Sequence, residues 1–226
     1  MIRTGVLNWW WVLQKDLRIE SRAWRVWPRL VALGLSITFL FGYGLALPPS
    51  LLPTIAGSLC WITVCLASLL TLSENNMSEK DHGCWAALSQ YPVAPSSVFL
   101  AKLTAHAIGL AILQSVVAGF LLVLWEIPVV SPLRLLSVML LGNLALSAIG
   151  TVVGAVATGT RNGQGILALV LLPLWIPVLL GAAKATSLIL SDEDAEQVWR
   201  WTQFLAACAT VYLAAGIMLF EFAMEE

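Results

Sequence analysis

The sequence predicts an all-α integral membrane protein with six transmembrane helices in a single domain over residues 1–226. Hydrophobic residues make up 59% of the chain, charged residues only 11%, and the mean hydropathy is +0.87. Soluble domains carry roughly 25% charged residues. Several uncharged stretches reach the ~20 residues that a helix needs to cross the bilayer core. Proline-containing or polar turns separate these stretches, so the chain is expected to cross the membrane several times.

The breaks between apolar stretches place the predicted spans. No charged residue occurs from Leu30 to Ser73, which is too long for one span and suits two joined by a turn at Pro48-Pro49-Ser50. Further breaks follow at the polar stretch 74–97, around Pro128, around Arg161 and at the acidic stretch 185–196. The spans are therefore predicted near residues 29–47, 51–72, 98–124, 133–158, 163–184 and 199–221.

Residues 1–27 are predicted to form an amphipathic helix at the membrane surface. They do not resemble a signal peptide, because no small-residue cleavage site follows a short apolar core. At the helical period one face gathers apolar residues and another gathers arginines, as in interfacial helices. The apolar face would hold Val6, Trp10, Leu13, Leu17 and Trp24, and the other Arg18, Arg22 and Arg25. A loosely ordered basic tail is the alternative interpretation.

The distribution of Lys and Arg predicts the orientation of the spans. Six spans place both termini on one side, and cytoplasmic connections carry more positive charge than outer ones. With both termini in the cytoplasm, the outer segments hold only Arg134, Lys184 and Arg200 of the 12 basic residues. The cytoplasmic segments hold Arg3, Lys15, Arg18, Arg22, Arg25, Arg29, Lys80, Lys102 and Arg161. The stretch 74–97 is then cytoplasmic and the stretch 185–196 faces outward.

Several classes of function find no support in the sequence. There is no phosphate-binding loop G-x-x-x-x-G-K-[ST], no H-E-x-x-H and no G-x-S-x-G. The predicted spans hold almost no ionisable residue, which argues against a proton-coupled carrier or an intramembrane hydrolase. The four cysteines form no C-x-x-C pair, and no basic tract suggests nucleic-acid binding. We expect no catalytic residue, no metal site and no ATP bound through a phosphate loop of this chain.

The polar stretch 74–97 is the longest interruption in the middle of the chain. Charged residues lead to a glycine, then to a short apolar face, and then to a proline stop; the residues are Glu79, Lys80, Asp81, Gly83, Trp85, Leu88 and Pro92. A short helix along the membrane surface would suit this pattern and could insert into a groove on a soluble partner. An ordinary amphipathic surface turn is the alternative.

Lys102 and His106 lie one turn apart where the third span begins, so they share a helix face. Lys102 is expected to extend its ammonium group toward the cytoplasmic headgroups. His106 lies deeper and needs a hydrogen-bond partner there. It is either a ligand for haem or another substrate, or a hydrogen-bonded residue between helices; a lone histidine favours the second interpretation.

Small residues and prolines mark the fourth and fifth spans. Gly150 and Gly154 form a small-residue face that allows close helix approach, either within the chain or across a dimer axis. Pro173 and Pro177 each remove a backbone hydrogen bond, so the fifth span is predicted to be kinked.

Tryptophans near span ends are interpreted as an aromatic belt at the membrane interfaces; they are Trp61, Trp125, Trp199 and Trp201.

Two segments carry a resemblance to a known family. The segments are D-H-G-C-W-A-A-L-S-Q-Y-P-V-A-P-S-S-V-F-L-A-K-L-T-A-H (81–106) and R-N-G-Q-G-I-L-A-L-V-L-L-P-L-W-I-P-V-L-L (161–180). They resemble the CcmB family, the membrane subunit of the cytochrome c maturation ABC transporter. Length and predicted spans agree over essentially the whole chain. In one respect the chain departs from the family pattern: Trp85 and Ala86 stand where the family usually has Leu and Glu.

The resemblance implies an ABC-2-like permease in the bacterial inner membrane. It would work as a homodimer with a CcmA-like ATPase subunit that binds the ATP, beside other membrane subunits of cytochrome c maturation. Residues 79–92 would be the coupling helix and residues 1–27 the membrane elbow. ATP hydrolysis would drive haem export or the release of a haem-loaded chaperone, so haem is a candidate substrate and no bound cofactor is expected. A non-transporting membrane scaffold and a general exporter of lipids or drugs are the alternatives.

Overall fold

The protein is built of α-helices and one short 3₁₀ turn in the part of the chain that the computed structural model describes. That part comprises residues 9–18, 26–44, 48–81, 94–158 and 163–225. Residues 9–18 are helical. The remaining elements, in chain order, are α2 (Val26–Gly44), η1 (Pro49–Leu51), α3 (Leu52–Asp81), α5 (Pro95–Leu124), α6 (Pro132–Thr158), α7 (Gly163–Leu190) and α8 (Ala195–Glu225).

Five helical stretches are long and apolar enough to cross a membrane. They are Pro49–Asn76, Pro95–Leu124, Pro132–Ala157, Leu167–Leu190 and Ala195–Glu221, and they coincide with the last five predicted spans. The chain is therefore an all-α, multi-pass membrane protein. The predicted first span, near 29–47, coincides with α2, but the apolar stretch described there, Pro28–Gly42, is shorter. Because a span needs about 20 apolar residues, the described part contains five candidate spans and one shorter apolar helix.

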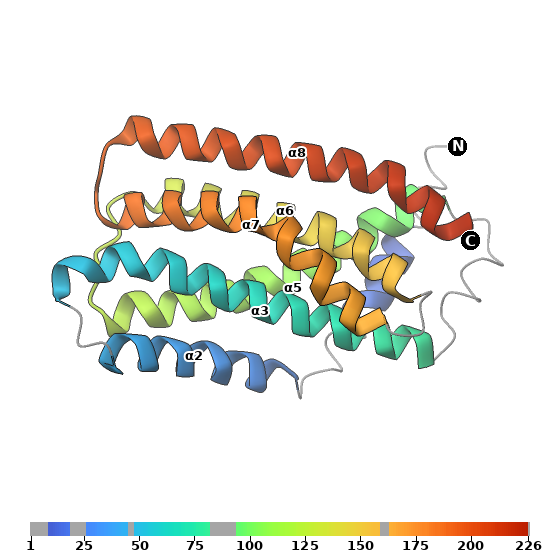
Figure 1. Ribbon diagram of the computed structural model, residues 1–226, viewed down its shortest axis with the longest axis horizontal. Coiled ribbons are helices and arrows are strands. Elements are labelled where there is room, and N and C mark those ends of the chain that lie inside the picture. The colour runs from blue at the N-terminus through green and yellow to red at the C-terminus, as the bar shows by residue number, and fades with distance from the viewer. Residues whose placement is uncertain (1–8, 19–25, 45–47, 82–93, 159–162, 226) are drawn as a thin grey trace.

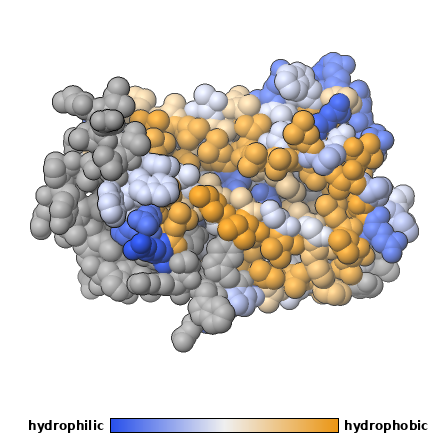
Figure 2. All heavy atoms as spheres, turned by 180° about the vertical axis from the view of Figure 1, so that it is seen from behind, coloured by the Kyte–Doolittle hydropathy of each residue, from blue (hydrophilic) through white to orange (hydrophobic). Residues whose placement is uncertain are grey.

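The helices lie side by side in a bundle, with α2 along one edge and α8 along the other (Figure 1). α2 packs against α3 and α5, while α6 and α7 pack against α8 and α3. The largest cluster of buried apolar side chains joins α3, α6 and α7 and includes Trp61, Leu146 and Trp175. Apolar side chains form a belt across the middle of the back face, as expected of a surface in contact with lipid (Figure 2).

The two ends of the bundle differ in what they carry. The helical residues 9–18, the ends of α3, α6 and α8 and the beginnings of α5 and α7 gather at one end (Figure 1). The connections 125–131 and 191–194 lie at the opposite end, where hydrophilic residues gather in Figure 2. The first end therefore carries the polar residues 74–81, and the second carries the acidic connection before α8.

The largest departures from the predicted span limits are at the ends of α3 and α7. α3 continues to Asp81, although its span was predicted to end near residue 72 and a loop to begin at 74. α7 continues to Leu190 rather than ending near 184, so the predicted outer loop 185–196 shrinks to the connection 191–194. Both predictions took the limit of the apolar stretch as the limit of the helix. In α3 the helix continues because charged and polar residues such as Glu and Lys are good helix formers. In α7 the single charge of Lys184 does not end the span, and the following residues 185–190 are buried.

At the second end of the bundle, α5 and α7 end with the same backbone motif. The amide of Ile127 donates to the carbonyl of Leu122, and the amide of Glu193 donates to that of Leu188, each over 3.0 Å. This six-to-one bond is the Schellman motif, which needs a left-handed residue just before the donor. Glu126 and Asp192 occupy that position with φ of 52°. Both helices thus end on an acidic residue in a conformation that favours glycine.

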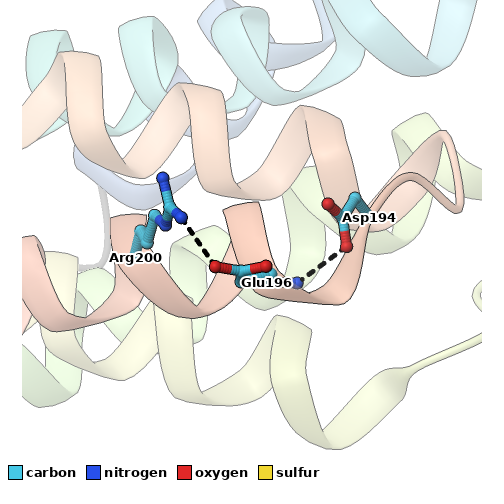
Figure 3. A network of polar contacts seen from close by, with 3 residues as sticks. All are labelled: Asp194, Glu196 and Arg200. Atoms are coloured by element: carbon cyan, nitrogen blue, oxygen red, sulfur yellow. Dashed lines mark hydrogen bonds and ion pairs between the residues drawn. The ribbon is translucent and has the colours of Figure 1, made fainter.

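α8 begins with a side-chain cap (Figure 3). The carboxylate of Asp194 accepts a hydrogen bond from the backbone amide of Glu196 at 3.0 Å. Glu196 in turn pairs with Arg200 one turn further along, at 2.6 Å between Oε1 and an Nη atom. The cap satisfies one of the amides that every helix leaves unpaired at its beginning. The acidic residues here thus serve the local structure of the helix.

Candidate functional site

The segment predicted to contact a soluble partner begins within α3. Glu79, Lys80 and Asp81 are the last residues of this helix, so the structure places them in a helical extension of α3. The other predicted residues of this segment lie outside the described part of the chain: Gly83, Trp85, Leu88 and Pro92. The backbone thus connects the transmembrane part of α3 to the predicted contact segment without a break before Asp81.

The polar end of α3 packs on the small-residue face of α6. A Cβ atom added at Gly150 would lie 2.8 Å from Cδ1 of Leu72. One added at Gly154 would lie 3.3 Å from both amide atoms of Asn76. The two glycines therefore allow α3 and α6 to approach closely within the chain.

α7 passes through both of its prolines as one continuous helix. Pro173 and Pro177 lie inside Gly163–Leu190, and the helix changes direction part-way along its length (Figure 1). Trp175, between them, is fully buried, and its indole Nε1 donates to the carbonyl of Leu146 at 3.2 Å. The proline-containing part of α7 is thus in direct contact with α6.

His106 lies between α5 and α3, with only 4% of its surface exposed. Its Nε2 atom is 2.9 Å from Oγ of Ser68. Its Nδ1 atom is buried and has no hydrogen-bond partner in the described structure. Because Ser68 occupies one ring nitrogen and packing covers the other, neither is open to a ligand in this conformation. Lys102, one turn earlier on α5, is half-buried.

A second buried polar contact joins α5 to α6. The side-chain amide of Asn143 donates to the carbonyl of Ala107 at 2.9 Å, and its oxygen accepts from Ser147 at 3.4 Å. Sequence reasoning overlooked Asn143, although a carboxamide in the middle of an apolar span is a signal, because it needs a partner there. Ser68 carries no comparable signal, since its partner lies 38 residues away in the chain.

Trp61 is a correction to the predicted aromatic belt. It was interpreted as an interfacial residue, but only 1% of it is exposed, and it lies in the core. Its indole Nε1 donates to Oγ1 of Thr186 at 3.0 Å. Its ring also packs against α6, where Gly142 leaves space for it. Trp61 therefore connects α3, α6 and α7 in the interior, and sequence reasoning missed this role.

The N-terminal helical residues 9–18 pack on the beginning of α5. Val12 and Leu13 are buried against Ala101 and Ala105, whereas Trp10 is exposed. Of the predicted apolar face, Leu13 packs on α5, whereas Trp10 lies on the outer surface. With 3.6 residues per turn, the buried face is centred about 100° away from residue 10. The amphipathic segment is therefore in contact with the helix that carries Lys102 and His106.

The CcmB protein family model matches residues 7–225, nearly the whole chain. The chain belongs to the CcmB family. It is 30% identical over 173 residues to heme exporter protein B of Rhodobacter capsulatus, covering 76% of this chain and 79% of the relative. It is 31% identical over 188 residues to the protein of the same name from Pseudomonas aeruginosa, covering 80% and 82%. Heme exporter protein B of Haemophilus influenzae is 34% identical over 176 residues, covering 76% and 78%.

In this CcmB-family chain several of the described hydrogen bonds join helices to one another. Across the described residues, no three His, Cys, Asp or Glu side chains are close enough together to hold a metal ion. Hydrogen bonds between helices link α3 to α5, α3 to α7, α5 to α6, α6 to α7 and α7 to α8.

Proposed function

We propose that this chain is the membrane permease subunit of an ABC transporter complex for cytochrome c maturation. In this proposal α2 is the first of six spans, and a separate CcmA-like subunit binds and hydrolyses ATP. Hydrolysis would drive haem export or the release of a haem-loaded chaperone. Membership in the CcmB family over residues 7–225, with relatives named heme exporter protein B, is the observation that carries the proposal.

The length of α3 supports a coupling role for residues 79–92. A helix of 30 residues is about 45 Å long, whereas the hydrocarbon core is only ~30 Å thick. The polar end of α3 would therefore project from the membrane toward the ATPase subunit. The same end of the bundle carries the N-terminal helical residues 9–18 and the end of α8 (Figure 1). This agrees with an orientation in which both termini and the coupling segment face the cytoplasm of a bacterial cell, with the chain in the inner membrane.

The proposed complex contains two copies of this chain, two ATPase subunits and other membrane subunits of cytochrome c maturation. Gly150 and Gly154 are covered by α3 of the same chain, so a dimer contact would use another surface. His106 has no part in haem binding in this proposal, because neither ring nitrogen is open.

Co-purification with the ATPase subunit encoded in the same genome tests the coupling role. Wild type is compared with Gly83→Pro and Leu88→Asp, which disturb the coupling segment. Val130→Asp is the matched control, because it places a charge in the exposed connection at the opposite end. We expect the ATPase to bind wild type and Val130→Asp, and to be lost from the two other variants while they still insert into the membrane. Equal binding to all four would contradict the coupling role of residues 79–92.

Reconstitution separates the proposed function from its alternatives. The complex in proteoliposomes is supplied with ATP, and haem movement and release of the haem-loaded chaperone are measured separately. Either output that depends on ATP supports the proposal. A complex that binds the ATPase but gives neither output would be a scaffold, and ATP-dependent movement of lipids or drugs without haem would indicate a general exporter.

A further inference from the structure

The two prolines divide α7 into two arms. Proline has no amide hydrogen, so Pro173 cannot donate to the carbonyl of Leu169, and Pro177 cannot donate to that of Pro173. Two successive turns of the helix each lack one backbone hydrogen bond. The bend of α7 is visible in Figure 1. A helix bends most easily where such bonds are absent, so the segment 173–177 is the place where α7 can change its direction.

The C-terminal arm is fixed to α3 by directional contacts. Thr186 accepts a hydrogen bond from the indole of Trp61 at 3.0 Å. Ser187 donates to the carbonyl of Thr54 at 2.6 Å. The backbones also meet closely, since a Cβ atom added at Gly57 would lie 2.8 Å from the backbone amide nitrogen of Ser187. Hydrogen bonds and close backbone contact at one place hold this arm in a single position relative to α3.

The proline segment itself is held from two sides. Trp175 donates to the carbonyl of Leu146 on α6 at 3.2 Å. From α8, the hydroxyl of Tyr212 donates to the carbonyl of Leu174 at 2.6 Å. That carbonyl lies one residue after Pro173, in the turn where the helix lacks backbone donors. The pivot is therefore fixed in place while its internal hydrogen bonding is weakened.

Residues 165–172 of the N-terminal arm form no such side-chain hydrogen bonds. Residues 165–172 read G-I-L-A-L-V-L-L, so none of their side chains can form a hydrogen bond. Leu167 and Leu171 are buried, while Leu169 is 77% exposed. Apolar contacts are non-directional and do not fix one position as hydrogen bonds do. This arm begins at the end of the bundle where α3 carries its polar extension (Figure 1).

We propose that Pro173–Pro177 is a hinge about which the N-terminal arm of α7 swings while the C-terminal arm stays fixed to α3. The hinge deepens the proposed function, because the ATPase subunit would act on the end of the bundle that carries the moving arm. The hinge itself is a property of this chain alone. From Gly165 to Pro173 the arm is about 12 Å long, so a change in bend of about 20° moves its tip by about 4 Å.

Distances between spin labels test the hinge in the purified chain in lipid nanodiscs. The four native cysteines are first replaced by alanine. One label is placed at Gly165 on the moving arm or at Leu180 on the fixed arm, and the other at Val211 on α8. All three positions are exposed, so the labels have similar surroundings. The pair 180–211 is the matched control, because it shares its reference label with the pair 165–211.

We expect the distribution of 165–211 distances to be broader than that of 180–211 distances by about 4 Å, which is the displacement of the arm's tip for a 20° change in bend. Pro173→Ala with Pro177→Ala should narrow it to the width of the control. Tyr212→Phe, which releases the pivot from α8, should broaden it further and provides a second test if the double variant does not fold. Equal widths for the two pairs in wild type would overturn the hinge.

The ATPase subunit and a non-hydrolysable ATP analogue are then added. We expect the 165–211 mean to shift and the 180–211 mean to stay unchanged. If the ATPase does not bind wild type, the proposed function fails, whereas the hinge is still decided by the widths measured without it. If the ATPase binds and the mean 165–211 distance does not change, the proposal that the ATPase subunit moves the hinge is wrong. The contact between the ATPase and the coupling segment would then still stand.

Discussion

Gly142→Ala tests the contact between Trp61 and α6. A Cβ atom at position 142 would lie 2.3 Å from Cη2 of the Trp61 ring, with two further ring atoms within 3.0 Å. The indole cannot easily move aside, because it is fully buried and donates a hydrogen bond to Thr186. The added methyl group must therefore push α3 and α6 apart or break this hydrogen bond.

The size of the effect follows from these two routes. Inserting a methyl group into a packed interior costs about 1–3 kcal/mol, and an interhelical hydrogen bond in a membrane contributes about 0.6–1.7 kcal/mol. We expect a loss of about 2–3 kcal/mol in the free energy of unfolding. For a chain of this length that loss lowers the melting temperature by about 4–12 °C.

Gly119→Ala is the matched control for Gly142→Ala. Both glycines lie inside helices, but a Cβ atom at Gly119 would meet nothing within 4 Å. The assay is the fraction of detergent-solubilised protein that remains monodisperse on size-exclusion chromatography after heating. Gly119→Ala should melt at or above the wild-type temperature, because alanine favours the helix. A smaller ring, Trp61→Phe, should partly rescue Gly142→Ala, so the two effects should not add. If Gly142→Ala melts with the control, the close contact at Trp61 is wrong.

Three further predictions use the same heating assay. Asp192→Gly and Glu126→Gly should each stabilise the protein by about 0.5–1 kcal/mol, since glycine adopts positive φ without strain; lower melting temperatures would contradict the left-handed helix ends. Asp194→Ala should cost about 0.5–2 kcal/mol through loss of the α8 cap, and an unchanged melting temperature would show that the cap is dispensable. Ser68→Ala should cost about 1–3 kcal/mol, because it leaves His106 with both ring nitrogens unpaired; additive effects of Ser68→Ala and His106→Ala would argue against their contact.

The positions of most spans follow from the sequence, because the bilayer imposes a minimum apolar length that composition records directly. Helix ends are less predictable. The charges from Glu74 onward mark where α3 leaves the apolar stretch, yet the helix continues to Asp81, because polar residues end a span without ending a helix. The kink expected in α7 follows from the sequence, because Pro173 and Pro177 have no amide hydrogen to donate, and α7 does bend (Figure 1).

The candidate site is less accessible to sequence reasoning. Trp61 was placed in an interfacial belt because tryptophan is common there, but its position depends on space left by Gly142 and a hydroxyl at Thr186. Neither partner is near it in the sequence. The pairing of His106 with Ser68 has the same cause: a hydrogen bond between two helices depends on their register, which hydropathy does not contain. The residues from Gly83 to Pro92 stay a prediction, since the described structure does not include them.

The contact of Trp61 with Thr186 also has a consequence for synthesis. The two residues are separated by 125 positions in the chain. At about 5–20 residues per second, the ribosome reaches Thr186 about 6–25 s after Trp61. During that interval α3 is already in the membrane with an indole donor that has no partner on α7, and the space beside Gly142 is only partly enclosed. The full set of interior contacts around Trp61 can therefore form only after α7 has been made.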